Sequence, residues 1–235
     1  MGRVFACSDL HGMYELYKKV CDFLQPDDIV YFLGDAIDRG PDSWDLFKKI
    51  INNPQWIVLK GNHEDMFANA IKEYYCNDER PGDAWYLSEY NGGGQTLADW
   101  MADGAYKDWA IIIDELPELK TYYNEIGDAI LLSHAGLTPN AFGVLDITNR
   151  ELIWDRSHFN DTWADGNDDI YIIHGHTPVP HIQKDLGIYK PYPINEVSAL
   201  WYCDNHKCCI DLGSFVTRKT VLLDLNTFEE HYIQL

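Results

Sequence analysis

Three short apolar runs alternate with amphipathic segments near the start of the chain, and this alternation strongly restricts the possible folds. The runs are RVFAC, DIVYFL and WIVLK, which begin at residues 3, 28 and 56. The segments 13–24 and 41–51 between them carry apolar residues at helical spacing, and the second opens with Pro-Asp-Ser, as helices often do. A strand–helix–strand–helix–strand order with about 27 residues per unit predicts right-handed crossovers and a parallel sheet.

The remaining elements are expected from the same periodicities and from turn residues. Helical structure is expected over 63–75, in a loop-rich middle at about 78–118, and as a short helix or turn over 150–156. Six further strands are expected, over 121–127, 129–136, 169–176, 201–211, 219–225 and 228–234. The last three of them are interpreted as one antiparallel set.

Length and charge limit the class of protein. The chain has 235 residues, which fits one domain over 1–235. Its 18 Lys and Arg residues stand against 38 Asp and Glu residues, so the formal net charge is −20. Nucleic acids and anionic membranes both attract basic surfaces, so we expect neither as a partner. Divalent cations held by some of the carboxylates would offset part of this charge.

The six cysteines are expected to be reduced thiols. No apolar leader precedes the first run, and no run approaches the ~18 apolar residues of a membrane-spanning helix. We therefore expect a cytoplasmic protein, and a monomer. The cluster CDNHKCC at 203–209 lacks a CxxC pair, so cysteines in a hairpin are expected there in place of a metal site.

Asp, His and Asn residues follow five of the apolar runs, in most cases next to a glycine. In open α/β sheets, ligands bind outside the carboxyl ends of the strands, so these side chains can converge. The segments are SDLHG (8–12), GDAIDRG (34–40), GNHE (61–64), SHAG (133–136) and HGHT (174–177).

The residue types in these segments match the ligands of divalent metal ions. Asp, His and Asn offer oxygen and nitrogen atoms suited to Mn, Fe or Zn. Each residue alone has an ordinary structural explanation, such as a turn, a helix N-cap or a buried histidine. Their joint placement at five strand ends favours a metal site. The ligands exceed what one ion takes, and two ions about 3.5–4 Å apart, bridged by a carboxylate, would use them.

The five segments, in this order, resemble the motifs of the calcineurin-like metallophosphoesterases. GDAIDRG together with GNHE is similar to the PPP-type serine/threonine phosphatases, in particular to their bacterial and phage branch, which includes lambda phosphatase. The resemblance implies an α/β fold (α+β in some schemes), with a central β-sandwich of mixed sheets flanked by helices in α/β/β/α layers. Four further segments support the resemblance, namely NGGGQT (91–96), HAGL (134–137), LIWDR (152–156) and CIDLGSFVTRKTVLLDL (209–225).

The resemblance also implies the ligands of two divalent cations, with Mn²⁺ expected and Fe or Zn as alternatives. Asp9 and His11 would hold the first cation, and Asp35 would bridge both. The ligands implied for the second cation are Asn62, His134 and His176.

For catalysis, the resemblance implies hydrolysis of phosphate monoesters, with a phosphoprotein or phosphopeptide as the substrate. A hydroxide bridging the two cations would attack phosphorus in line. His63 would protonate the leaving alcohol, and Asp38 would orient and charge that imidazole. Arg39 and Arg156 would grip the phosphate, helped by Asn62.

Some positions depart from the family pattern or leave a choice open. Ser8 stands where the first motif usually begins with Gly. In HGHT, alignment on Gly-His-Thr favours His176 over His174 as the ligand. The stretch 181–202 cannot be aligned and is either a substrate-side loop or a longer connection. Histidines without motif support are expected at the surface, namely His158, His181, His206 and His231.

Three other functions compete with this interpretation. One is a diadenosine tetraphosphate hydrolase of the same superfamily. Such hydrolases resemble each other in a GNHD motif where this chain has GNHE, and they carry Ala at the position of Asp38. A nuclease or phosphodiesterase would need a basic surface, which is not expected from a composition with an excess of acidic residues. A non-enzymatic regulatory module predicts damaged ligands, whereas every expected ligand is present.

Overall fold

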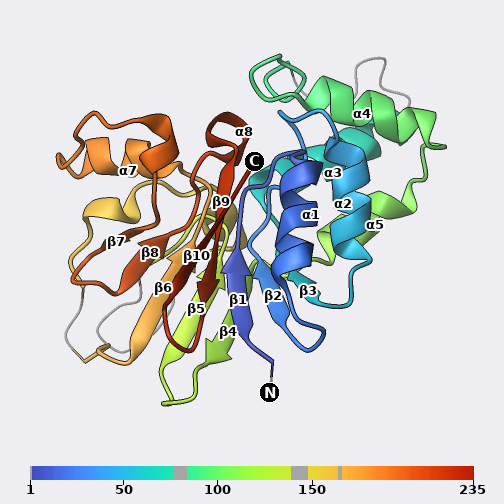
Figure 1. The fold of residues 1–235 in the computed structure, drawn as a ribbon. Helices are drawn as coiled ribbons and strands as arrows, with labels where there is room; N and C mark the ends of the chain where they lie inside the picture. The colour runs from blue at the N-terminus through green and yellow to red at the C-terminus, as the bar shows by residue number, and fades with distance from the viewer. Residues whose placement is uncertain (1, 77–83, 139–147, 164–165) are drawn as a thin grey trace.

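The computed structural model describes residues 2–76, 84–138, 148–163 and 166–235 (Figure 1). Within these residues, one sheet has the strand order β10-β9-β1-β2-β3 and the other the order β4-β5-β6-β8-β7. The strands are β1 (Val4–Cys7), β2 (Ile29–Phe32), β3 (Trp56–Val58), β4 (Leu119–Tyr123), β5 (Ala129–Ser133), β6 (Ile170–His174), β7 (Leu200–Tyr202), β8 (Lys207–Cys209), β9 (Lys219–Asp224) and β10 (Glu230–Gln234).

Helices surround the two sheets, and none of those in the described ranges is long and apolar enough to cross a membrane. The α-helices are α1 (Tyr14–Phe23), α2 (Ser43–Ile51), α3 (Asn62–Tyr75), α4 (Gly93–Ala102), α5 (Asp108–Asp114), α6 (Asn149–Trp154), α7 (Val179–Asp185) and α8 (Ser214–Thr217). Two short 3₁₀ helices are η1 (His158–Asn160) and η2 (Ile194–Glu196).

The first sheet contains the predicted parallel unit. β1 pairs in parallel with β2, with Phe5 opposite Val30, and β2 pairs in parallel with β3, with Phe32 opposite Val58. The helices α1 and α2 form the two crossovers and lie on the same side of this sheet (Figure 1). This part of the sequence-based prediction is confirmed.

The prediction that the tail forms one antiparallel set is wrong. The segment 201–211 forms the hairpin β7–β8, and β8 joins the second sheet in parallel with β6, with Ile173 opposite Cys208. β9 and β10 are antiparallel to each other but belong to the first sheet, where β9 pairs with β1. An alternating pattern determines which face a strand buries, but it does not determine which sheet the strand joins.

The strand side chains of the first sheet alternate between two apolar layers, because successive residues of a strand point to opposite faces of its sheet. Phe5 and Phe32 pack on the side covered by α1 and α2. Ala6 and Leu223 of the first sheet pack instead with Ile173 of the second. The two sheets therefore form a sandwich with helices outside it, as expected.

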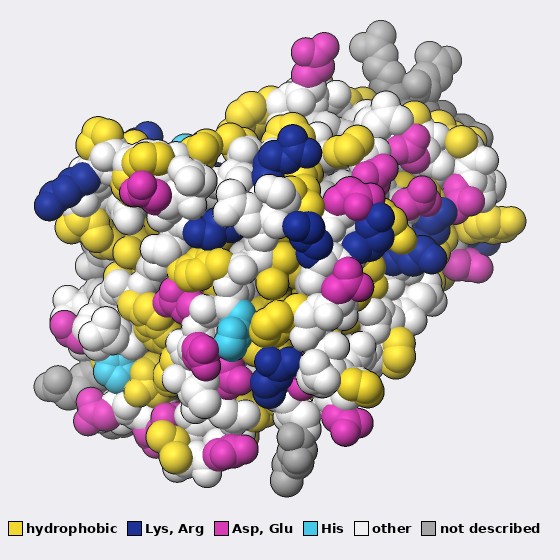
Figure 2. Space-filling view, viewed as in Figure 1, with side chains coloured by type: hydrophobic (Ala, Val, Ile, Leu, Met, Phe, Trp, Pro, Cys, Tyr) yellow, Lys and Arg dark blue, Asp and Glu magenta, His cyan; other side chains and the backbone are white. Residues whose placement is uncertain are grey.

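The surface carries charges of both signs. Figure 2 shows Lys and Arg side chains interspersed with Asp and Glu side chains on the face in view, with no continuous basic stripe outside the residues drawn in grey. This distribution agrees with the excess of acidic residues in the composition.

Candidate dinuclear metal centre

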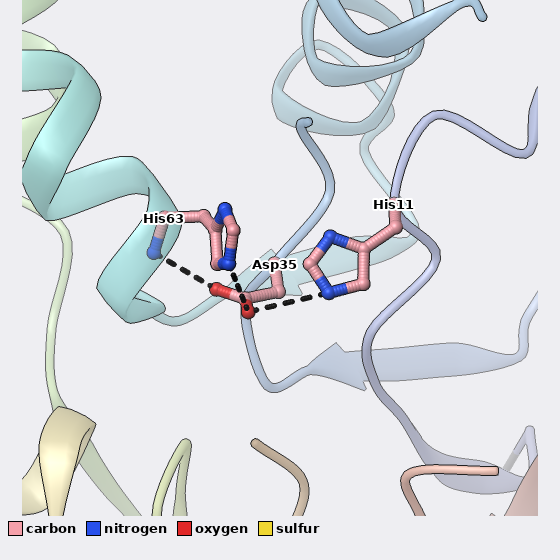
Figure 3. A group of neighbouring side chains, drawn as sticks. All are labelled: His11, Asp35 and His63. Carbon is pink, nitrogen blue, oxygen red and sulfur yellow. Dashed lines mark hydrogen bonds and ion pairs between the residues drawn. The ribbon is translucent and has the colours of Figure 1, made fainter. Parts of the chain in front are cut away.

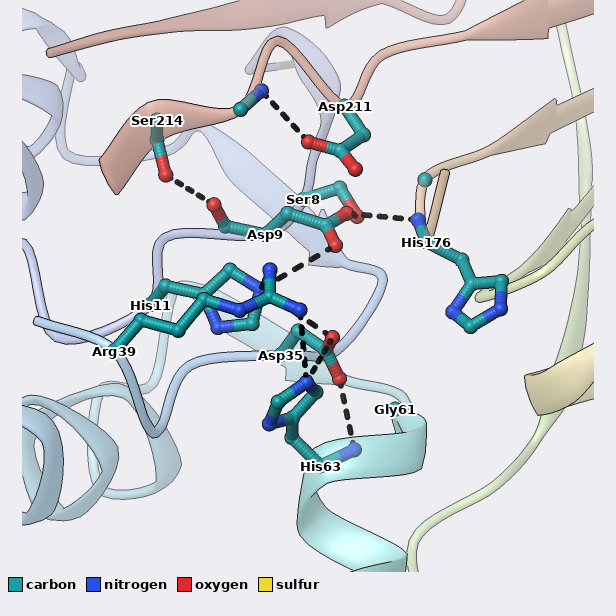
Figure 4. Close-up of polar contacts among 12 residues, drawn as sticks. Ser8, Asp9, His11, Asp35, Arg39, Gly61, His63, His176, Asp211 and Ser214 are labelled. Carbon is teal, nitrogen blue, oxygen red and sulfur yellow. Dashed lines mark hydrogen bonds and ion pairs between the residues drawn. The ribbon is translucent and has the colours of Figure 1, made fainter. Parts of the chain in front are cut away.

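The predicted ligands converge where the carboxyl ends of the strands of both sheets meet, and Figure 4 shows four of them, Asp9, His11, Asp35 and His176. The two sheets are joined here by His134, whose Nδ1 lies 2.8 Å from the carbonyl oxygen of Leu33. Every predicted ligand is buried, with at most 4% of its surface exposed: Asp9 and His11 after β1, Asp35 after β2, Asn62 at the start of α3, His134 after β5 and His176 after β6.

Many site residues hold a left-handed backbone conformation, which non-glycine residues adopt at a cost of about 1–3 kcal/mol each. Such strain persists only where the surrounding packing enforces it, and it concentrates at functional sites. The positive φ angles are 52° at Asp9, 42° at His11, 61° at Asp35, 68° at Asp38, 64° at Arg39 and 67° at His176.

Asp35 lies at the centre of the cluster (Figure 3). Its Oδ2 is 3.5 Å from Nε2 of His11, and its Oδ1 is 3.4 Å from Nε2 of His134. Among the described residues, the potential ligand atoms form two close groups, one with His11 and His63 and one with Asp9 and His134, and Asp35 belongs to both. These groups differ from the predicted ligand sets, since Asp9 lies with His134 and not with His11. The two oxygens of Asp35 nevertheless face separate groups, as a carboxylate bridging two cations requires.

The ligands predicted for the second cation are the most closely spaced. Oδ1 of Asn62 lies 2.9 Å from Nε2 of His134 and 2.9 Å from Nδ1 of His176. Ligand atoms bonded to one cation at about 2.1 Å lie roughly 3 Å apart. The three side chains are therefore spaced to bind a single ion.

Two buried atoms of predicted ligand residues in the described part of the chain lack a hydrogen-bond partner: Oδ1 of Asp9, and Nε2 of His176, which is not the ring nitrogen that faces Asn62. Buried polar atoms are rarely left unpaired. Oδ1 of Asp9 faces Nε2 of His11 across 3.9 Å, where the first cation is predicted. A cation bound there would satisfy this oxygen, so the donor set fits a divalent metal.

The charges of the cluster depend strongly on each other. Burial alone would raise the pKa of Asp35, but His134 and His63 outweigh burial and hold that pKa well below its usual range. Burial would lower the pKa of His134, but Asp35 raises it to about 9. Burial and the neighbouring Asp211 raise the pKa of Asp9. Bound cations would favour the ionised carboxylates and the neutral imidazoles, because both forms are the ones that bind metal.

The predicted acid His63 is held by its predicted partner Asp38. Nδ1 of His63 lies 2.7 Å from Oδ2 of Asp38, and Nε2 is 3.9 Å from Oδ2 of Asp35. The other oxygen of Asp38 accepts hydrogen bonds from Thr96 at 2.5 Å and from the Tyr86 hydroxyl at 3.4 Å. With both oxygens occupied in this way, Asp38 orients His63 and is not among the potential metal ligands.

The two predicted phosphate-binding arginines take different positions. Nη1 of Arg39 is 2.7 Å from Nε2 of His11, and Nη2 is 3.2 Å from Nε2 of His63. Arg156 is exposed and donates from Nε to the hydroxyl of Thr177 at 3.0 Å. Arg39 thus contacts a predicted metal ligand and the predicted acid, whereas Arg156 is hydrogen-bonded to Thr177.

Sequence reasoning missed the residues that position this machinery. The carboxylate of Glu64 accepts hydrogen bonds from the backbone N–H groups of Asp35 and Ala36, each at 2.8 Å, and of Gly61 at 3.0 Å. It thereby fixes the turn that presents Asp35. An acidic residue three positions after Gly61, at a helix start, is the signal that could have indicated this role.

The remaining histidines and cysteines lie outside the cluster. His174 turns away from the ligands, with Nε2 2.8 Å from the Tyr202 hydroxyl. The surface prediction for His158 is wrong, because it is 3% exposed and its Nε2 lies 2.7 Å from the carbonyl oxygen of Ala135. Burial and the adjacent Lys207 lower its pKa to about 4. All six cysteines are free, and the three at 203–209 lie in or beside the predicted hairpin.

Comparison with known proteins agrees with this geometry. Residues 2–212 match the family of calcineurin-like phosphoesterases. The chain is 30% identical to serine/threonine-protein phosphatase 2 of Escherichia coli over 194 residues, which cover 77% of this chain and 82% of that protein.

Two solved structures share the fold. One is described as a candidate diadenosine tetraphosphatase, with a TM-score of 0.62 and 14% identity over 99% of this chain and 93% of the other. The second is a serine/threonine phosphatase from Saccharomyces cerevisiae, with a TM-score of 0.56 and 13% identity over 100% and 80%.

The protein is thus a phosphoesterase with two mixed sheets and, at their edge, a buried cluster of side chains that could hold metal ions. The chain belongs to the calcineurin-like phosphoesterases.

Proposed function

We propose that the chain is a serine/threonine protein phosphatase that uses two divalent cations, with Mn²⁺ as the expected ion. The observation that carries this proposal is the buried His63–Asp38 pair, 2.7 Å apart, next to Asp35. The alkoxide of serine or threonine is a poor leaving group, so cleavage of such a monoester needs a proton donor at this place. The E. coli relative, whose name is that of a serine/threonine phosphatase, supports the same substrate class.

Each of the site residues would have its own role in the hydrolysis of the phosphate ester. Bound cations would supply positive charge and a water whose pKa lies near neutrality. His63 would donate its Nε2 proton to the leaving oxygen, while Asp38 stabilises the protonated imidazole and fixes its ring. Arg39 and Arg156 would hold the phosphoryl oxygens, because planar guanidinium groups match them in geometry.

A panel of substrates tests this proposal. With Mn²⁺, the protein is expected to hydrolyse p-nitrophenyl phosphate and a phosphothreonine peptide, and EDTA is expected to abolish both activities. Diadenosine tetraphosphate belongs in the same panel, because a fold relative is described as its hydrolase. We expect kcat/KM for the peptide to exceed that for the dinucleotide by at least about tenfold. The reverse order would overturn the protein phosphatase proposal and favour the dinucleotide.

A further inference from the structure

The carboxylate of Asp9 uses its two oxygens for different purposes (Figure 4). Oδ2 accepts a hydrogen bond from the Ser8 hydroxyl and another from the backbone N–H of His176 at 3.1 Å. Oδ1 has no hydrogen bond and faces His11 across 3.9 Å. One oxygen is therefore held by the protein, and the other is left for a cation.

The surroundings of Oδ2 are filled by protein. A Cβ placed on Gly175 would collide with both Oδ2 of Asp9 and Oγ of Ser8, so the backbone at Gly175 closes directly over this oxygen. Ser8 is 2% exposed, and Asp9 is 1% exposed. A cation cannot approach Asp9 from this side without displacing the serine hydroxyl or the backbone.

A further contact fixes the backbone of Asp9. The hydroxyl of Ser214, at the start of α8, donates to the carbonyl oxygen of Asp9. Ser214 follows Gly213, whose N–H donates to the Asp211 carboxylate at 2.8 Å. The main chain of Asp9 is thus anchored independently of Ser8. The Ser8 hydroxyl, together with the N–H of His176, restricts the rotation of the carboxylate about its last single bond.

We propose that the Ser8 hydroxyl is a positioning group that holds Asp9 as a single-oxygen ligand, Oδ1 toward His11, and thereby strengthens the first cation site. A glycine or an alanine at this position could not make this hydrogen bond. Hydrogen-bond partners of metal ligands orient them and raise their affinity, and their loss typically weakens metal binding by about 10–100-fold. The inference rests on the cation pair of the proposed function. It adds that the Ser8 hydroxyl helps to set the affinity of the first cation site.

The test is a calorimetric titration of the metal-free protein with Mn²⁺, without any substrate. In Ser8→Ala and Ser8→Gly, one of the two binding steps is expected to weaken by about 10–100-fold, while the other keeps its affinity. Ser43→Ala is the matched control, since Ser43 is also a buried serine near this edge but donates to Gly40 at 2.9 Å and does not touch Asp9. The control is expected to titrate as the wild type does.

Two results would overturn the inference. The first is wild-type affinity at both steps in Ser8→Ala. The second is an equal weakening of both steps together with a lower melting temperature of the metal-free variant, which would make Ser8 a general structural residue. Failure of the proposed function looks different, because a wild type that binds two Mn²⁺ ions but leaves phosphopeptides intact would refute only the substrate assignment.

Discussion

Replacing His63 by Asn is expected to lower kcat for a phosphothreonine peptide by about 10²–10⁴-fold. His63 is 1% exposed, and Asp38 holds its Nδ1, so its Nε2 is the atom placed to protonate the leaving oxygen. Asn is similar in polarity but cannot act as an acid near neutral pH. The measurement is steady-state hydrolysis of the peptide at saturating Mn²⁺.

A second substrate separates the loss of the acid from damage to the site. The p-nitrophenolate ion leaves without needing a proton, so His63→Asn is expected to lose much less activity on p-nitrophenyl phosphate than on the peptide. His181→Asn is the control, because this histidine is exposed on α7 and the substitution is expected to leave both rates unchanged. Equal losses on the two substrates, or full activity on the peptide, would contradict the role of His63.

Asp35→Asn is expected to abolish hydrolysis and to weaken Mn²⁺ binding at both sites. The two oxygens of Asp35 face different ligand groups, 3.5 Å from His11 and 3.4 Å from His134, so one substitution removes a charge that both cations share. Removing a hydrogen-bond partner of a metal ligand typically weakens metal binding by about 10–100-fold. Removing the charge of the bridging ligand itself is expected to weaken Mn²⁺ binding by more than that.

Equilibrium dialysis with Mn²⁺ measures this effect directly. Asp185→Asn, at the exposed end of α7, removes the same charge from a residue that is not a predicted ligand, and is expected to bind as the wild type does. If Asp35→Asn retained two Mn²⁺ ions at wild-type affinity, Asp35 could not be the bridge between them.

The convergence of the ligands could be predicted because it follows from topology. Parallel strands place their carboxyl ends at one edge, and the segments after β1, β2 and β3 carry Asp9, Asp35 and Asn62 there. The partnership of His63 with Asp38 came from the resemblance to known motifs, and the structure places the two side chains within hydrogen-bond distance.

Other features could not be predicted because they depend on contacts distant in sequence. The hairpin β7–β8 and the pair β9–β10 have similar strand patterns, yet their partners β6 and β1 lie in different sheets. The burial of His158 depends on Ala135 and on Lys207, which follows 49 residues later and donates to its carbonyl oxygen. The left-handed backbone of Asp9 and Asp35 could not be predicted from residue type, because Asp adopts this conformation more often than most residues but still rarely, and the surrounding fold imposes it.

The central claim is that two divalent cations bind on either side of Asp35. Anomalous X-ray diffraction from crystals grown with Mn²⁺ tests it most directly, because each bound ion gives its own peak. We predict two peaks about 3.5–4 Å apart, the first beside Asp9 and His11 and the second beside Asn62, His134 and His176. A single peak, or two peaks that Asp35 does not touch, would contradict the account.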